Sequence, residues 1–144
     1  MKTTTSLTAL MLGASLLVAP AFAEDVTVTL TGVKAAGGEI LVSLQTQDQF
    51  LKPAGTYGAK AAAPAKDGTV TLVIKGVAPG TYSMSALHDQ NNDRQMAMGA
   101  NGMPGEGWAM HNGTMLQAAP TWGDVSFVVG AAPVALTEPM IYPQ

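Results

Sequence analysis

Apolar and polar residues alternate along most of the chain that follows residue 24. Val26, Val28 and Leu30 share one face of an extended segment, and threonines occupy the positions between them. The same period of two recurs over residues 40–44 and 70–74. Because successive side chains of a strand point to opposite faces of a sheet, this alternation predicts half-buried β-strands.

Turn-forming residues separate these segments. Gly37-Gly38 is a candidate for a two-residue hairpin, and Asp67-Gly68 and Pro79-Gly80 are turn signals. Two further strands are expected within Asp124–Val129 and within Val134–Tyr142.

The remaining segments are less regular. Residues 48–51 fit one helical turn, residues 55–63 fit either a strand of small residues or a loop, and Pro139 marks the last strand as an edge strand or a bulge. No amphipathic helix of ten or more residues is apparent. About seven short strands predict an all-β fold, a single two-sheet antiparallel β-sandwich of Greek-key, transthyretin- or immunoglobulin-like type with one long loop.

The segment Ala78-Pro79-Gly80-Thr81-Tyr82 predicts a structural corner. Proline presets the backbone for the second position of a turn, and glycine accepts the positive φ that a type II turn needs next. Tyr82 then begins a strand. Its hydroxyl is either bonded back to the backbone at this corner or belongs to an ordinary half-buried aromatic residue.

The first 23 residues have the pattern of an export signal. Lys2 precedes an apolar stretch over residues 7–18, and Ala21-Phe22-Ala23 supplies a cleavage site of small residues. We therefore expect residues 1–23 to be a signal peptide and residues 24–144 to form the β-sandwich domain, in the periplasm or secreted. The apolar stretch is shorter than a membrane span, and no later segment is long and apolar enough for one.

The composition excludes some classes of binding partner. Without Lys2, 6 basic residues stand against 10 acidic ones, and Arg94 is the only arginine. Nucleic-acid binding requires clustered basic residues, so we expect no nucleic-acid partner. The chain has no cysteine, which excludes disulfides and a lipid-attachment thiol. The expected partner is an unknown ligand of the envelope or the extracellular space.

Most of the chemically distinctive side chains lie in one polar, glycine-rich stretch. It runs from His88-Asp89-Gln90-Asn91-Asn92-Asp93 to Gly102-Met103-Pro104-Gly105-Glu106-Gly107-Trp108. Long polar loops on a small domain are where function commonly resides. The residues expected to bind a ligand or organise this loop are His88, Asp89, Asn91, Asp93, Glu106, Trp108 and Asn112.

The ordered series of these motifs resembles a family of secreted bacterial proteins, domain of unknown function 2141. The resemblance rests on Pro79-Gly80-Thr81-Tyr82, His88-Asp89-x-Asn91, Gly102-x-Pro104-x-Glu106-Gly107-Trp108 and Asn112, and it covers the whole of residues 24–144. It implies a secreted β-sandwich without an established activity. The chain departs from the family pattern at Arg94, where relatives often have glycine, and at Ala97, where they often have aspartate.

Calcium binding is one alternative for the loop. Asp89, Asn91 and Asp93 offer oxygen donors at alternate positions, as calcium loops do. However, Arg94 and Ala100 stand where such a loop requires its sharp-turn glycine and its bidentate acid. The other interpretation is a turn whose Asp and Asn side chains cap their own backbone, so that no cofactor is expected.

His88 and the methionines pose a second choice. His88 shares strand parity with Tyr82, which predicts a structural histidine that points inward and bonds the backbone of the following loop. A copper site is the alternative, because thioethers suit Cu(I) and imidazole suits Cu(II). Its ligands would come from Met96, Met98, Met103, Met110, Met115 and His111, with His88 as a further candidate. Met103 and Met110 also suit packing beneath the loop, where relatives usually carry aliphatic or aromatic residues.

Enzyme signatures are missing from the sequence. It has neither a Gly-x-Ser-x-Gly elbow nor a His-Glu-x-x-His helix. A small hydrolase using Asp89, Asp93 and Glu106 is a further alternative. Glu106 and Trp108 are better explained as groups that fix the loop, the acid by accepting backbone N–H groups. We expect an exported, non-catalytic module that binds a ligand or serves as a structural accessory of the envelope.

Overall fold

The computed structural model describes residues 22–144, so residues 1–21 of the expected signal peptide lie outside the described part. The described chain forms eight strands, two 3-10 turns and one short helix. The strands are β1 (Glu24–Val33), β2 (Glu39–Gln45), β3 (Tyr57–Ala62), β4 (Gly68–Val77), β5 (Gly80–Asp89), β6 (Gly107–Met110), β7 (Ser126–Val129) and β8 (Val134–Pro139). The helical pieces are η1 (Gln47–Gln49), η2 (Gly113–Met115) and α1 (Trp122–Val125).

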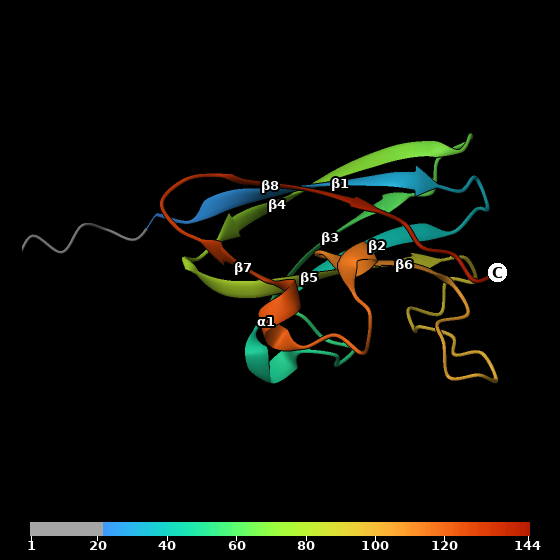
Figure 1. The fold of residues 1–144 in the computed structure, drawn as a ribbon. Coiled ribbons are helices and arrows are strands. Elements are labelled where there is room, and N and C mark those ends of the chain that lie inside the picture. The colour runs from blue at the N-terminus through green and yellow to red at the C-terminus, as the bar shows by residue number, and fades with distance from the viewer. Residues whose placement is uncertain (1–21) are drawn as a thin grey trace, which may run out of the picture.

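The strands form two packed sheets, which confirms the predicted β-sandwich. One sheet has the order β4-β1-β8, and the other has the order β3-β2-β5-β6 with β7 also paired to β5. In Figure 1 the first sheet forms the upper layer and the second the lower layer, while η1 and α1 lie beneath the lower sheet. We call these the upper and lower sheets.

The pairing of β1 departs from the predicted antiparallel arrangement. β1 runs antiparallel to β4 but parallel to β8, with Val28 opposite Leu136. A parallel neighbour cannot be joined by a tight turn, and β8 reaches β1 only after the chain has completed the lower sheet. β8 is an edge strand, and Pro139 lies at its end, as expected.

The predicted hairpin at Gly37-Gly38 is wrong. β1 belongs to the upper sheet and β2 to the lower one, so the glycine pair joins the two sheets. Both glycines have positive φ. A Cβ on Gly38 would collide with the backbone of Asp89, so this position also needs a residue without a side chain.

Other short elements could be only partly predicted. The ambiguous segment over residues 55–63 contains β3, and the expected helical turn near residue 48 is η1. Residues 122–125 form α1 before β7 begins at Ser126. Strand β6 was not predicted, because its four residues begin with a glycine and show no alternation of apolar and polar side chains.

The core lies between the sheets and matches the alternating positions. Val26, Val28 and Leu30 of β1 are fully buried. They meet inward residues of β2 and β5, among them Leu44 and Met84, which are also fully buried. Burial of apolar area of this kind is the main stabilising contribution to the fold.

For the corner before β5, the predicted hydrogen bond of Tyr82 is confirmed and the predicted type II turn is wrong. The Tyr82 hydroxyl donates to the Ala78 carbonyl oxygen at 3.0 Å. Gly80 does not have the positive φ that a type II turn needs. It is instead needed for space, since a Cβ there would lie 3.1–3.3 Å from the end of the Tyr82 ring. Glycine allows the ring to fold back over the corner.

A second tyrosine completes the corner. The Tyr57 hydroxyl of β3 accepts the Ala78 N–H at 3.2 Å. The rings of Tyr57 and Tyr82 meet edge to face with centroids 5.8 Å apart. Tyrosine hydroxyls therefore satisfy both backbone polar groups of Ala78 at the point where the chain crosses from the upper to the lower sheet, outside either ladder.

The free edge of β5 is shared by two short strands. β6 pairs with Ser85–His88, and β7 pairs with Gly80–Ser83. Residues 111–125 connect them and leave the plane of the sheet to form η2 and α1 (Figure 1). The ring of Trp122 then packs edge to face on Phe50 beside η1, with centroids 5.7 Å apart. No helix among residues 22–144 has the length and apolar character needed to cross a bilayer.

The corner predicts a graded loss of stability. Tyr82→Phe should lower the free energy of unfolding by about 1 kcal/mol, because it removes one buried hydrogen bond. Tyr82→Ala should lower it by roughly 3 kcal/mol or more through lost packing. Denaturant midpoints measure both changes. An unchanged midpoint for Tyr82→Phe would show that the hydroxyl bond contributes nothing.

Candidate functional site

His88 lies near the C-terminal end of β5, and its side chain is fully buried. Its Nε2 is 2.8 Å from the Gly37 carbonyl oxygen, and its Nδ1 is 2.8 Å from the Tyr142 hydroxyl. A carbonyl only accepts, so Nε2 donates to the Gly37 carbonyl oxygen, and the Tyr142 hydroxyl is the partner of Nδ1. The inward direction agrees with its strand parity, but the backbone partner lies in the β1–β2 connection and not in the following loop.

Tyr142 is fixed from three sides. Its hydroxyl accepts the Lys34 N–H at 2.9 Å, and the Lys34 ammonium lies 4.6 Å from the ring centroid. The ring also covers Gly107 so closely that a Cβ there would collide with it. His88 therefore acts as a positioning residue that joins the β1–β2 connection, β5 and the C-terminal segment.

Asp89 lies on the other face of β5 from His88 and is also fully buried. Its carboxylate accepts the N–H of Asp93 at 3.1 Å through Oδ1 and the N–H of Arg94 at 2.9 Å through Oδ2. Asn92 and Arg94 both have φ of 59°, the left-handed region that glycine favours. The tight turn thus forms with arginine at the position where glycine would be unstrained.

The side chains of Asn91 and Asp93 also bind within the loop itself. Asn91 Oδ1 accepts the Asp93 N–H at 3.1 Å, and Asp93 Oδ1 accepts the Gln95 N–H at 2.8 Å. The Asn91 amide donates to Asp93 Oδ2 at 2.9 Å. These are the self-capping turns that compete with calcium chelation for the same oxygens.

Glu106 ties the two ends of the 90–106 loop together. It is 7% exposed, and its carboxylate accepts the N–H of Gln90 and the N–H of Ala97, each at 3.2 Å. Beyond Ala97 the chain makes a smaller turn, in which the Gly99 N–H donates to the Met103 carbonyl at 2.8 Å. In Figure 1 the 90–106 loop lies below the lower sheet at the right, coloured yellow to orange.

Trp108 connects the loop to the end of the chain. Its backbone exchanges two hydrogen bonds with Ile141, at 2.8 and 2.7 Å, so the segment after β8 closes one end of the seam between the sheets. A hollow of about 700 Å³ opens beside it. We call it the loop groove; it is lined by Gly99, Ala100, Asn101, Met103, Pro104, Gly105, Trp108, Ile141, Tyr142, Pro143 and Gln144.

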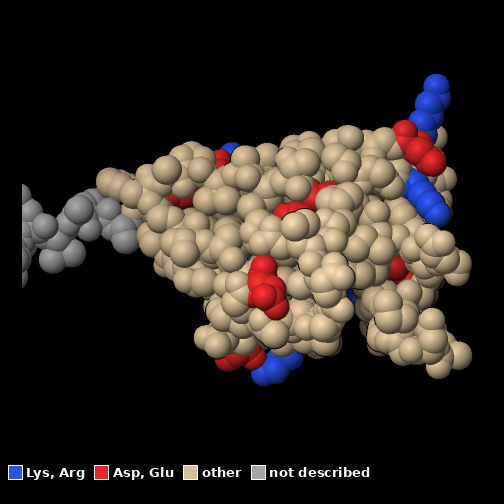
Figure 2. Space-filling model, in the orientation of Figure 1, with Lys and Arg blue, Asp and Glu red and all other residues tan. Residues whose placement is uncertain are grey.

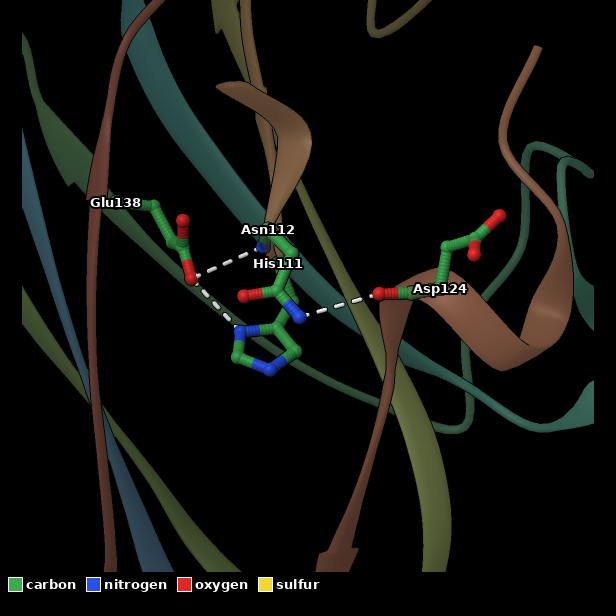
Figure 3. Close-up of polar contacts among 4 residues, drawn as sticks. All are labelled: His111, Asn112, Asp124 and Glu138. Carbon is green, nitrogen blue, oxygen red and sulfur yellow. Dashed lines mark hydrogen bonds and ion pairs between the residues drawn. The ribbon is translucent and has the colours of Figure 1, made fainter. Parts of the chain in front are cut away.

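A second polar centre lies farther along the same seam, between β8 and the break separating β6 from β7. Figure 3 shows Glu138 accepting from His111 Nδ1 at 2.7 Å and from the Asn112 N–H at 3.3 Å. Asn112 also donates through its side chain to the Asp124 carbonyl at 3.1 Å. Glu138 is 6% exposed, and it fixes the point where the chain leaves the lower sheet.

Sequence reasoning missed Glu138. The signal was present, since Glu138 has the inward parity of Leu136 in an otherwise alternating strand. An acid at a core-facing position requires a buried partner. His111, proposed from sequence as a copper ligand, is that partner, and Asn112 organises the same turn. A hollow of about 610 Å³ opens beside this turn, lined by Asn112, Met115, Leu116, Gln117, Ala118, Ala119, Thr121 and Asp124.

The methionines are divided between core and surface. Met110 is 9% exposed, whereas Met98, Met103 and Met115 are 61%, 57% and 75% exposed. Met103 lines the loop groove, and Met115 lines the second hollow. Within residues 22–144, no three His, Asp or Glu side chains form a group that could hold a metal ion. Packing thus explains Met110, while the exposed thioethers need another explanation.

The comparisons with known proteins identify the family. The profile described as "Uncharacterized protein conserved in bacteria (DUF2141)" matches residues 28–137, and the chain belongs to this family. Neither the curated proteins nor the solved structures contain a significant match. The matched range includes the corner, the 90–106 loop, Trp108 and Asn112.

Alkaline pH should destabilise the protein through its phenols. Burial raises the pKa of Tyr82 and of Tyr142 above the ordinary value of 10.0. Their stabilising contribution is complete below pH 10 and is lost as pH rises through the folded-state pKa values, because unfolding then releases protons. Denaturant midpoints against pH should fall less steeply in Tyr82→Phe/Tyr142→Phe. An equally steep fall would assign the effect to other groups.

Calcium should change the stability little. Modules outside the cell bind calcium with Kd of about 0.1–1 mM, so ~10 mM calcium would visibly raise the melting temperature of a true site. Asp89→Ala should destabilise the protein by about 1–3 kcal/mol equally with calcium and with chelator, because it strands two N–H groups. A calcium-induced rise abolished by Asp89→Ala would contradict the structural role. Copper(I) is tested in parallel with Met96→Leu/Met98→Leu and His111→Ala.

Proposed function

We propose that this member of the DUF2141 family is exported and acts in the bacterial envelope as a non-catalytic binding module. The small-residue site at Ala21 and Ala23 supports export. The 90–106 loop supports binding, because its polar side chains fix its own backbone and leave an apolar surface exposed. Within the loop, residues 95–105 contain no charged residue.

One observation carries the proposal. The carboxylates of Asp89 and Glu106 are buried acceptors for loop N–H groups. Because these bonds anchor the loop, the two carboxylates are not free to act as metal ligands or as catalytic bases. What the loop presents to its surroundings is Met98 and Met103, more than half exposed, beside the loop groove. Flexible thioethers are common on binding surfaces. This arrangement suits recognition better than hydrolysis or metal storage.

The exposed tip has a distinct appearance on the surface. Figure 2 shows the lobe at the lower right, where the 90–106 loop lies in Figure 1, without acidic or basic colouring at its tip. A notch separates this lobe from the body of the molecule in the same view. Apolar atoms that protrude on a rigid loop are a common feature of interaction sites.

Export and binding are tested on the secreted product. Its N-terminus, determined by intact mass, should be Glu24. Protein carrying an affinity tag before Glu24, away from the groove-lining C-terminal segment, should co-sediment with the cell-envelope fraction. Met98→Ser/Met103→Ser should reduce this binding, because both changes make the tip polar.

The matched control is Met115→Ser, which alters an even more exposed thioether outside the 90–106 loop. All variants should keep the parental melting temperature, because none of the three side chains is buried. Equal binding by the parent and the Met98→Ser/Met103→Ser variant would overturn the loop as the working surface. Retention of residues 1–23 would overturn export by cleavage.

A further inference from the structure

The loop groove holds two aromatic residues in fixed positions. Tyr142 is held by His88, Lys34 and the close approach of Gly107. Trp108 is held by its two backbone bonds to Ile141, and its ring lies against Gly113, where an added Cβ would be 3.6 Å from Cζ3. Aromatic rings fixed before binding lose little conformational entropy when a ligand arrives.

The groove has no charged side chain. Every lining residue is glycine, alanine, proline, an aliphatic or aromatic residue, methionine, asparagine or glutamine. An ionic ligand would lose its hydration here without gaining an opposite charge from the lining, and the nearby Lys34 ammonium already lies against the Tyr142 ring. The lining therefore fits an uncharged ligand with an apolar face.

The same lining offers hydrogen-bonding groups at its rim. Asn101 uses its side-chain oxygen to accept the Met103 N–H at 3.1 Å, which leaves its amide N–H groups directed to no partner in the described chain. The carbonyl oxygens of Ala100 and Asn101 also accept no hydrogen bond from residues 22–144. Donors and acceptors around aromatic rings suit a polyhydroxylated ligand better than a hydrocarbon.

The lower sheet beside the groove also presents apolar side chains next to hydrogen-bonding groups. Trp108 is paired with Leu87, which is paired with Leu41, so one row crosses β6, β5 and β2 on the outer face of the lower sheet. All three side chains are only partly buried. In the next row Ser43 and Ser85 have their hydroxyl oxygens 3.0 Å apart. The row of apolar residues beside hydroxyls lets a ligand extend beyond the groove.

We propose that the loop groove binds an uncharged saccharide, with a sugar ring stacked on Trp108. This rests on the proposed binding function and names its ligand class. The carbon-bound hydrogens on one face of a sugar pack on the indole, and its hydroxyls bond Asn101 and the loop backbone. Lys34 and His88 are positioning residues, because they act by holding Tyr142 in place.

The two tryptophans of the chain allow a direct test. Trp122→Phe leaves Trp108 as the only indole fluorophore, and Trp108→Phe leaves Trp122, which packs on Phe50 outside the groove. Each variant of the mature protein is titrated with three neutral oligosaccharides, from cellulose, starch and chitin, and with an anionic fragment of polygalacturonate. Calorimetry of the unmodified mature protein with the same sugars gives the affinity.

The expected result is a saturable fluorescence change with a neutral oligosaccharide in Trp122→Phe and none in Trp108→Phe. Trp108→Ala should weaken calorimetric binding about tenfold or more, equivalent to 1.4 kcal/mol. The circular dichroism spectrum of Trp108→Ala must match that of the parent protein. If it does not, Trp108→Phe, which keeps an aromatic ring, replaces it in the calorimetry.

Three outcomes would overturn the saccharide proposal. They are flat titrations with all three neutral sugars, preference for the anionic fragment, and neutral-sugar binding that Trp108→Ala and Trp108→Phe leave unchanged. If the sugars fail while envelope binding still depends on Met98 and Met103, the ligand class is wrong and the binding function stands. If envelope binding is absent as well, both proposals fail.

Discussion

The structure depends on satisfying backbone N–H groups wherever the chain leaves a sheet. Between paired strands the ladder satisfies the N–H groups, but where the chain leaves a sheet a buried N–H must find a partner elsewhere or incur the cost of burial. Three buried carboxylates meet this need at the two departures beside β5. Asp89 and Glu106 bind the N–H groups of the 90–106 loop, and Glu138 binds the turn after β6. Charge-assisted bonds of this kind are stronger than neutral ones, so they stabilise irregular backbone where no ladder is available.

This requirement explains why the residues that resemble a ligand set behave as structure. Carboxylate oxygens attract cations and N–H groups alike, and the nearest N–H groups belong to the same turn. The left-handed conformations of Asn92 and Arg94 belong to the turn whose N–H groups Asp89 accepts. A cation would have to displace these bonds before binding. The chemistry left for recognition is then that of the side chains at the loop tip and in the loop groove, which are apolar or aromatic.

The sequence predicted the parts of the fold that follow from local patterns. Alternation located β1, β2 and β4, and strand parity directed His88 inward, since both depend only on the period of a strand. Pairing depends on distant residues, so the Gly37-Gly38 hairpin was mispredicted, and the parallel pairing of β8 with β1 was not foreseen in an otherwise antiparallel sandwich. For the site, Glu106 as a loop anchor followed from its surroundings in sequence. The role of Tyr142 did not, because nothing local indicates that residue 142 meets residues 34 and 88.

The C-terminal segment supplies the second wall of the loop groove, the ligand site that we propose. β8 follows β1 in the upper sheet to Pro139, and Ile141 then pairs with Trp108 of the lower sheet. That crossing closes one end of the seam and brings Tyr142 over Gly107, where His88 fixes it. The groove therefore has one wall from the loop, which Asp89 and Glu106 hold, and one wall from the crossing segment, which His88 holds. Since buried residues of β5, together with Glu106 just before β6, hold both walls, the groove is formed without a ligand, and the binding that we propose does not incur the cost of ordering the loop.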